Sequence, residues 1–286
     1  MKLITALFAL CLATPAWAEP DMLVSGVKMP AWVERGVQRL PLAPGMELSN
    51  GDILLTGQNS RVLLKAADGS DIKLGESARL ALSGLAPKRD GQPLFSAALN
   101  VLKGAFRFTT SAVAKLRGRE VMVKVAGATV GIRGTDVWGK AAETDKDVVC
   151  LIEGKISVNY LDEPAFVMDE PLSFYKMPKN AAPAPVAKVD MEQLKKWAAE
   201  TEIATGQGAA RMGGVWKVDL KTVEGEAATL AAYDELRAAG YDARILPLDA
   251  GKYRLYIMQL PSRDEATALA RELTGKMGID SPSVSR

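Results

Sequence analysis

The sequence contains no histidine among its 286 residues. This absence excludes catalytic triads that use an imidazole base and removes the commonest ligand of transition metals. Cysteine is almost as scarce, because Cys11 and Cys150 are the two examples. Since Cys11 lies in a segment expected to be cleaved, the mature chain would form neither an intramolecular disulfide nor a thiolate zinc site. We therefore expect no cofactor and no metal.

Long hydrophobic runs are also missing. Residues 3–13 form a short apolar run that falls below the ~20 residues of a membrane-spanning helix. Lys2 precedes this run, and Ala16-Trp17-Ala18 follows it with the small-x-small pattern that signal peptidase cuts. The pattern predicts a cleavable signal peptide over residues 1–18 and export to the periplasm. No later segment is long and apolar enough to predict a transmembrane helix in the mature chain.

Charge of either sign is nowhere concentrated. The chain has 36 basic and 34 acidic side chains, and no block of basic residues stands out. A near-neutral chain of this kind lacks the positive surface that binds the phosphate backbone. Nucleic acid is therefore not expected as a partner.

Residues 23–160 are rich in short β-prone runs. Apolar and polar side chains alternate in several of them, such as residues 61–64 and 121–125, which is the period of a half-buried strand. Turn signals separate the runs, for example Asn50-Gly51 and Asp68-Gly69. The pattern predicts an all-β domain that is a sandwich, a roll or a solenoid.

Residues 161–212 differ in composition because they contain several prolines and an alanine-proline run at 181–185. Proline fixes φ and donates no backbone hydrogen bond, so we expect an extended spacer here. One helix is predicted within it, over about residues 190–204, with Asp190 as its N-cap. Leu194 and Trp197 would form the apolar face that packs against a domain.

Residues 213–286 change pattern once more, because helical and strand periods alternate. The order strand, helix, strand, strand, helix, strand predicts an α+β domain with a ferredoxin-like βαββαβ fold. The expected elements are strands at 215–220, 241–248, 253–260 and 281–285, and helices at 226–239 and 263–277.

The β-rich part resembles a FecR-type domain. The resemblance begins at residues 48–57 with Asn50-Gly51-Asp52, continues through 102–108 and 128–136, and ends at 153–158. It implies an interaction or sensing module. In the family's sensors a cytoplasmic anti-sigma segment and a membrane helix precede this domain, whereas a cleavable leader is expected in their place here. The iron-signalling role of those sensors is therefore not carried over. Arg133 invites an anion-binding hypothesis, and the favoured alternative is an arginine that binds either strand-edge carbonyls or Asp136.

The terminal block resembles a SPOR domain, a family that binds peptidoglycan glycan strands lacking stem peptides. The resemblance is carried by residues 216–220, 236–245, 253–257 and 262–266. Three departures stand out. Asp219 replaces the glutamine usual in the family, Lys221-Thr222-Val223 replaces Gly-Ser-Phe, and Met258-Gln259 replaces a common Gly-Pro.

In that fold both helices cover one face of the sheet, and the other face binds glycan. Alternation places Val218, Leu220, Leu255 and Ile257 toward the helices. Sugar binding needs fixed hydrogen-bonding groups and a flat apolar surface, which Arg254, Asp219 and the ring of Tyr256 would supply. The alternative is a solvated face with a charge pair across strands. The predicted glycan-binding residues are Asp219, Thr222, Lys252, Arg254 and Tyr256.

We therefore expect a periplasmic protein that binds rather than catalyses. Its partners would be peptidoglycan glycan strands and an envelope protein that contacts the β-rich domain. Two alternatives stay open: a cell-wall hydrolase that uses two carboxylates, and a structural envelope protein whose SPOR-like domain mediates protein assembly. Cell division, wall remodelling and envelope sensing are all compatible with these features.

Overall fold

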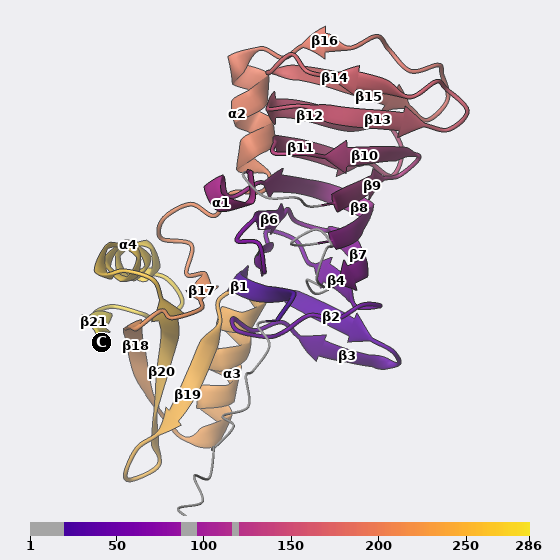
Figure 1. Ribbon diagram of the computed structural model, residues 1–286. Helices are drawn as coiled ribbons and strands as arrows, with labels where there is room; N and C mark the ends of the chain where they lie inside the picture. The colour runs from indigo at the N-terminus through magenta and orange to yellow at the C-terminus, as the bar shows by residue number, and fades with distance from the viewer. Residues whose placement is uncertain (1–19, 87–95, 116–119) are drawn as a thin grey trace, which may run out of the picture.

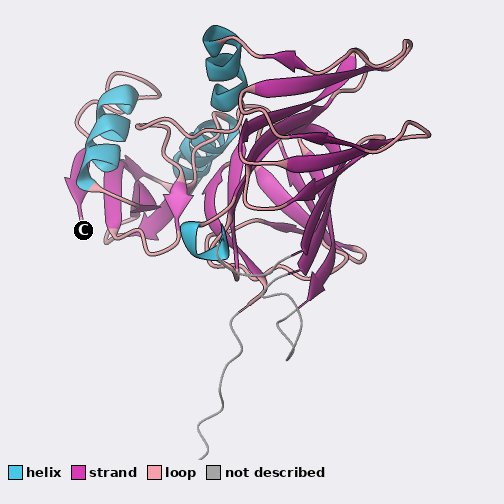
Figure 2. Ribbon diagram, turned by 45° about the horizontal axis from the view of Figure 1, so that its top comes forward, coloured by secondary structure: helices cyan, strands magenta, loops and turns pink. Residues whose placement is uncertain are grey.

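The computed structural model describes residues 20–86, 96–115 and 120–286, so the expected signal peptide lies outside the described residues. Within them, no helix combines the length and hydropathy needed to cross a membrane. The described chain forms a β-rich domain and a smaller terminal block, and Figures 1 and 2 both show the terminal block to one side of the β-rich domain.

Two sheets build the β-rich domain, and β8 (Ser96–Thr109) crosses from one to the other. All pairings within it are antiparallel except that of β8 with β9. Figure 1 shows the strands stacked one above another from β3 to β16. The first sheet has the order β17 (Ala210–Arg211), β1 (Met22–Lys28), β5 (Arg61–Ala66), β6 (Asp71–Leu74), β8, β11 (Asp136–Ala141), β12 (Lys146–Glu153), β15 (Ser173–Pro178) and β16 (Ala187–Lys188). The second has the order β3 (Gln38–Pro41), β2 (Ala31–Arg35), β4 (Ile53–Thr56), β7 (Arg79–Ala86), β8, β9 (Glu120–Val125), β10 (Ala128–Ile132), β13 (Ile156–Tyr160) and β14 (Phe166–Met168).

The two sheets share one apolar core. Strand β5 shows how the sequence builds it, because Val62 and Leu64 are fully buried while their neighbours along the strand are partly exposed. Phe106 and Phe108, near the end of β8, contribute the largest fully buried side chains to the same core. The alternating period of a half-buried strand therefore led to the correct class, a mostly β architecture.

Helix α2 (Met191–Ala199) covers the outer face of the first sheet. Beneath it β11 and β12 are buried on both faces, which is why their burial does not alternate. Trp138 and Cys150 lie in this second cluster, and Leu194 and Trp197 of α2 pack against it. The carboxylate of Asp190 accepts a hydrogen bond from the Gln193 amide, so the predicted N-cap is confirmed.

The prediction of an extended spacer over residues 161–212 is wrong. Strands β14, β15 and β16 pair within the two sheets, α2 packs on the first sheet, and β17 pairs with β1. Pro164 and Pro171 lie outside the strands, and Pro178 is the last residue of β15. Because the prolines avoid the interior of the hydrogen-bonded ladders, their number does not prevent sheet formation.

The terminal block contains β18 (Trp216–Glu224), α3 (Glu226–Ala238), β19 (Ala243–Pro247), β20 (Lys252–Leu260), α4 (Arg263–Leu273) and β21 (Ser283–Ser285). Its sheet has the order β19-β20-β18-β21, and every pair is antiparallel. The four side chains predicted to face the helices, Val218, Leu220, Leu255 and Ile257, are buried in one core with Leu236 of α3 and Leu269 of α4.

Candidate functional site

The face of the terminal sheet opposite its helices carries all five predicted site residues. Asp219 pairs with Tyr256 and Thr222 pairs with Arg254, and directly paired residues share a face. Lys252 lies two residues before Arg254 on β20, so its side chain points to the same side. We call this surface the open face.

A β-bulge is what brings Thr222 onto the open face. Asp219 and Thr222 are three residues apart, and a regular strand would place them on opposite faces. The register shifts between Asp219 and Lys221, so Leu220 and Lys221 both lie on the helix side. There the ammonium of Lys221 donates a hydrogen bond of 2.5 Å to the Met277 carbonyl.

Charges of both signs meet at the centre of the open face. The Asp219 carboxylate lies 3.8 Å from the Arg254 guanidinium and 3.9 Å from the Lys217 ammonium. These distances exceed those of direct hydrogen bonds, so the guanidinium keeps donors for a ligand. The side chain of Arg254 is 38% exposed and that of Asp219 is 19% exposed.

A groove of about 290 Å³ runs along one end of the open face. Asp219 and Tyr256 line it, whereas Thr222, Lys252 and Arg254 continue the face toward the β19–β20 turn. The sequence analysis missed three lining residues that could contact a ligand: Trp216, Leu246 and Arg286. Leu246 could have been found by alternation, since it pairs with Arg254 and is an exposed leucine on a strand.

Trp216 and Arg286 form one wall of the groove. The Arg286 guanidinium lies over the indole ring, 5.3 Å from its centroid, which is within cation–π range. Leu246 and Met258 add apolar surface to the same groove. The groove therefore combines flat apolar surface with charged groups, which is the lining typical of small-ligand sites.

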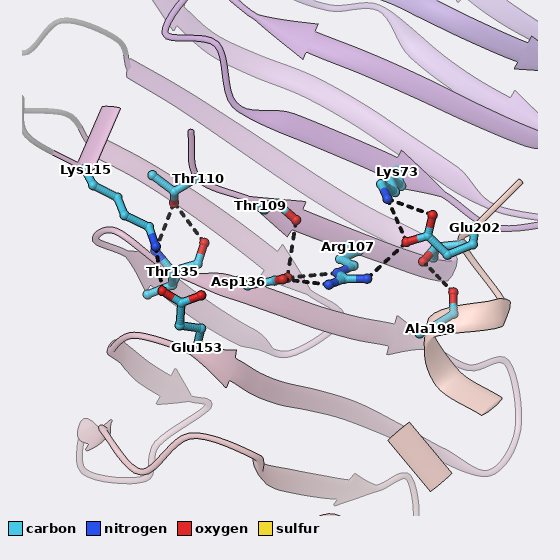
Figure 3. A network of polar contacts seen from close by, with 11 residues as sticks. Lys73, Arg107, Thr109, Thr110, Lys115, Thr135, Asp136, Glu153, Ala198 and Glu202 are labelled. Carbon is cyan, nitrogen blue, oxygen red and sulfur yellow. Dashed lines mark hydrogen bonds and ion pairs between the residues drawn. The ribbon is translucent and has the colours of Figure 1, made fainter. Parts of the chain in front are cut away.

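The β-rich domain holds a polar network on the outer face of its first sheet, shown in Figure 3. Arg107 donates to both carboxylate oxygens of Asp136, at 2.9 and 2.7 Å, and to Glu202 at 3.0 Å. Lys73 donates to both oxygens of Glu202, at 2.6 and 2.8 Å. Since Glu202 follows α2, these bonds tie the chain after the helix to the sheet (Figure 3).

The expected ion pair of Arg133 with Asp136 does not form, whereas the binding of Arg133 to strand-edge carbonyls stays a prediction. Asp136 is bound in bidentate fashion by Arg107, and Arg133 is exposed at the end of β10. Strand pairing explains the difference, because β8 and β11 are neighbours and bring Arg107 close to Asp136. Anion binding by Arg133 stays a hypothesis.

The described part of the chain contains neither a cluster of possible metal ligands nor an exposed thiol. Residues 20–86, 96–115 and 120–286 contain no group of three or more carboxylate or thiol side chains placed to hold an ion. Burial, with the charge of Asp136, raises the pKa of the Cys150 thiol to about 12. The thiol is therefore protonated at neutral pH and behaves as a small apolar side chain.

Comparison with known proteins identifies both parts of the chain. Residues 52–157 match the family model described as FecR protein, and residues 213–286 match the model described as SPOR domain. No curated protein matches the chain. Two crystal structures of a protein from Parabacteroides distasonis described as an anti-sigma factor are similar at a TM-score of 0.41. The first is 11% identical and covers 70% of this chain and 96% of its own, and the second is 10% identical and covers 73% and 99%. The chain thus carries a FecR-type domain followed by a C-terminal SPOR domain.

Proposed function

We propose that this protein binds peptidoglycan glycan strands in the periplasm through the open face of its SPOR domain, without catalysing a reaction. The observation that carries the proposal is the accessibility of that face, since Thr222 and Lys252 are exposed and Arg254 keeps unpaired donors. The sheet order β19-β20-β18-β21 and the packing of α3 and α4 in one core with the sheet support the ferredoxin-like unit that we propose for this domain.

The open face offers the groups that a glycan strand requires. Glycan hydroxyl and acetamido groups need both donors and acceptors, which Arg254 and Asp219 supply at the centre of the face. The rings of Tyr256 and Trp216 supply flat apolar surface for the sugar rings in the adjacent groove. Thr222 and Lys252 would contact the strand farther along the sheet.

The FecR-type domain would act as an interaction module for an envelope protein. The packing of α2 on its first sheet gives the domain a fixed surface for such a partner. In this proposal the segment 1–18 directs export and is removed, so the working protein begins at Glu19.

The test is sedimentation of the purified protein with denuded glycan strands. Arg254→Ala should weaken the affinity for glycan at least about tenfold, because a hydrogen bond from a charged group contributes roughly 1.5–3 kcal/mol. Arg263→Ala is the matched control, since it removes the same side chain from an exposed site at the start of α4. Equal binding by the parent and Arg254→Ala would remove Arg254 from the site.

Two rival functions give different results in the same preparation. A protein that assembles through its SPOR domain would fail to sediment with glycan and would self-associate in sedimentation velocity. A wall hydrolase would lower the turbidity of purified cell-wall material, and a carboxylate variant such as Asp219→Asn would abolish that loss. Binding without a change in turbidity is the outcome expected here.

A further inference from the structure

We infer that the glycan-binding surface extends beyond the SPOR domain, into the cleft between β19 and the FecR-type domain, so that both domains contact one strand. This inference rests on the proposed function of the open face. The cleft has a volume of about 590 Å³, and its two walls come from different domains. Pro41, Leu42 and Ala43 line one side, and Asp242, Arg244 and Tyr256 line the other.

Tyr256 joins the cleft to the open face, because it lines both the cleft and the groove beside Asp219. The volumes favour a shared site. The groove of about 290 Å³ lies at the lower limit of small-ligand sites, whereas the cleft of about 590 Å³ falls well inside the usual range of ~300–1,000 Å³. A strand that lies across Tyr256 therefore has room to continue into the cleft.

The SPOR wall of the cleft carries hydrogen-bond donors held in place. Arg237 donates to one oxygen of Asp242 at 2.7 Å, and Arg244 donates to the other at 3.3 Å. A guanidinium has five N–H groups, so Arg244, whose side chain is 45% exposed, keeps donors for hydroxyl or acetamido oxygens. The facing wall is apolar at Pro41 and Ala43, which suits the nonpolar side of a sugar ring.

The outer edge of β19 adds backbone groups to the same wall. Within the described residues, β19 pairs with β20 and with no other strand. Apart from the Ala243 amide, which donates to the Tyr241 carbonyl at 2.9 Å, its outward N–H and C=O groups are therefore available to a ligand with amide groups, such as an N-acetylated sugar. An extended peptide could also use this edge, but β19 has five residues and ends at Pro247, which donates no hydrogen bond.

The junction between the domains fixes the width of the cleft. Strand β17, just ahead of the SPOR domain, pairs with Gly26 and Val27 of β1. Glu265 of α4 accepts hydrogen bonds from the amides of Gly206 and Gly208, at 2.8 and 3.1 Å. A cleft whose walls are tied together in this way is organised before the ligand arrives, which lowers the entropy cost of binding.

The experiment narrows the cleft from the side of the FecR-type domain. In the full chain, Ala43→Trp places a bulky ring at an exposed lining position without changing any SPOR residue. The control is Val37→Trp, a fully exposed position between β2 and β3 that does not line the cleft. The probe is denuded glycan, fractionated by strand length, and the readout is the dissociation constant of each fraction.

We expect Ala43→Trp to weaken binding of long strands at least about tenfold and to leave the shortest bound strands nearly unaffected, while Val37→Trp matches the parent throughout. Arg244→Ala should show the same dependence on length, and it serves as the second variant if Ala43→Trp fails to fold. Parental binding of every fraction by both variants would overturn the composite site. Absence of glycan binding by the parent would instead overturn the proposed function. If an added extended peptide bound to the parent and both substitutions weakened that binding while glycan binding stayed intact, the choice of glycan for the cleft would be overturned.

Discussion

The indole rings of Trp138 and Trp197 are stacked, with centroids 4.9 Å apart and planes inclined by 9°. Trp138 is fully buried on β11, and Trp197 reaches it from α2, 59 residues later in the chain. Phe174 of β15 closes the cluster with an edge contact to Trp197, at 5.6 Å between centroids. The stacked pair makes α2 an integral part of the FecR-type domain's packing.

Trp197→Ala should lower the free energy of unfolding of the domain by about 3 kcal/mol, because it removes a large packed ring and uncovers Trp138. Urea denaturation followed by tryptophan fluorescence measures the change. Met191→Ala, an exposed position at the start of the same helix, should change it by less than about 0.5 kcal/mol. Similar effects of the two substitutions would show that α2 does not depend on the stacked pair.

Cys150 predicts a fall in stability at alkaline pH. Burial raises the pKa of its thiol from 9.0 to about 12, so the unfolded chain releases the thiol proton earlier than the folded chain. The contribution of this thiol to the free energy of unfolding is complete below pH 9. It is lost as the pH rises toward 12, by up to ~1.4 kcal/mol per pH unit. Denaturation curves at pH 8 and pH 10 should therefore differ more for the parent than for Cys150→Ala, which retains every other titrating group.

The partly buried Arg107–Asp136 pair should contribute more to stability than an exposed ion pair. Arg107→Met leaves the Asp136 carboxylate, 12% exposed, without its bidentate partner, and should cost about 2–4 kcal/mol. Lys65→Met breaks an exposed pair with Asp71 and should cost less than ~1 kcal/mol. Chemical denaturation of both variants decides the point, and equal losses would contradict it. Adding Asp136→Asn to Arg107→Met should recover part of the loss.

Adjacent residues of β20 should separate stability from binding. Leu255→Ala truncates a fully buried side chain of the SPOR core and should destabilise the domain by ~2–4 kcal/mol. Arg254→Ala, on the open face, should leave the melting temperature nearly unchanged while it weakens glycan sedimentation. A large shift in melting temperature for Arg254→Ala would mean that its ion pair with Asp219 holds the sheet rather than the ligand.

The local period of the sequence predicted the β-rich class of residues 23–160 and the order of strands and helices in the terminal block, but not strands β14, β15, β16 and β17. Alternation in residues 61–64 indicated the buried pair Val62 and Leu64, and alternation in the terminal block indicated the buried side chains of Leu255 and Ile257. The apolar face of α2 was predicted, but its partner was not, because the contact of Trp197 with Trp138 is non-local and leaves no periodic signal. Proline content was misleading for residues 161–212, since what matters is whether each proline interrupts a ladder.

The predicted site residues came from a resemblance and from alternation, and the structure places them on one face. The β-bulge after Asp219 could not be anticipated from a regular period, although Thr222 depends on it to share that face. Leu246 was within reach of the same alternation. The cleft beside Tyr256 was not, because one of its walls belongs to residues more than two hundred positions earlier.

The pairing of β17 with β1 also decides how force would pass through the molecule. A SPOR domain attached to the wall would pull on a hydrogen-bonded strand rather than on a flexible linker. Load would then enter the FecR-type domain at one end of its stack of strands, and the opposite end, near β16, would stand at a set height above the anchoring point (Figure 1). A partner bound at that end would then be held at a defined distance from the polymer.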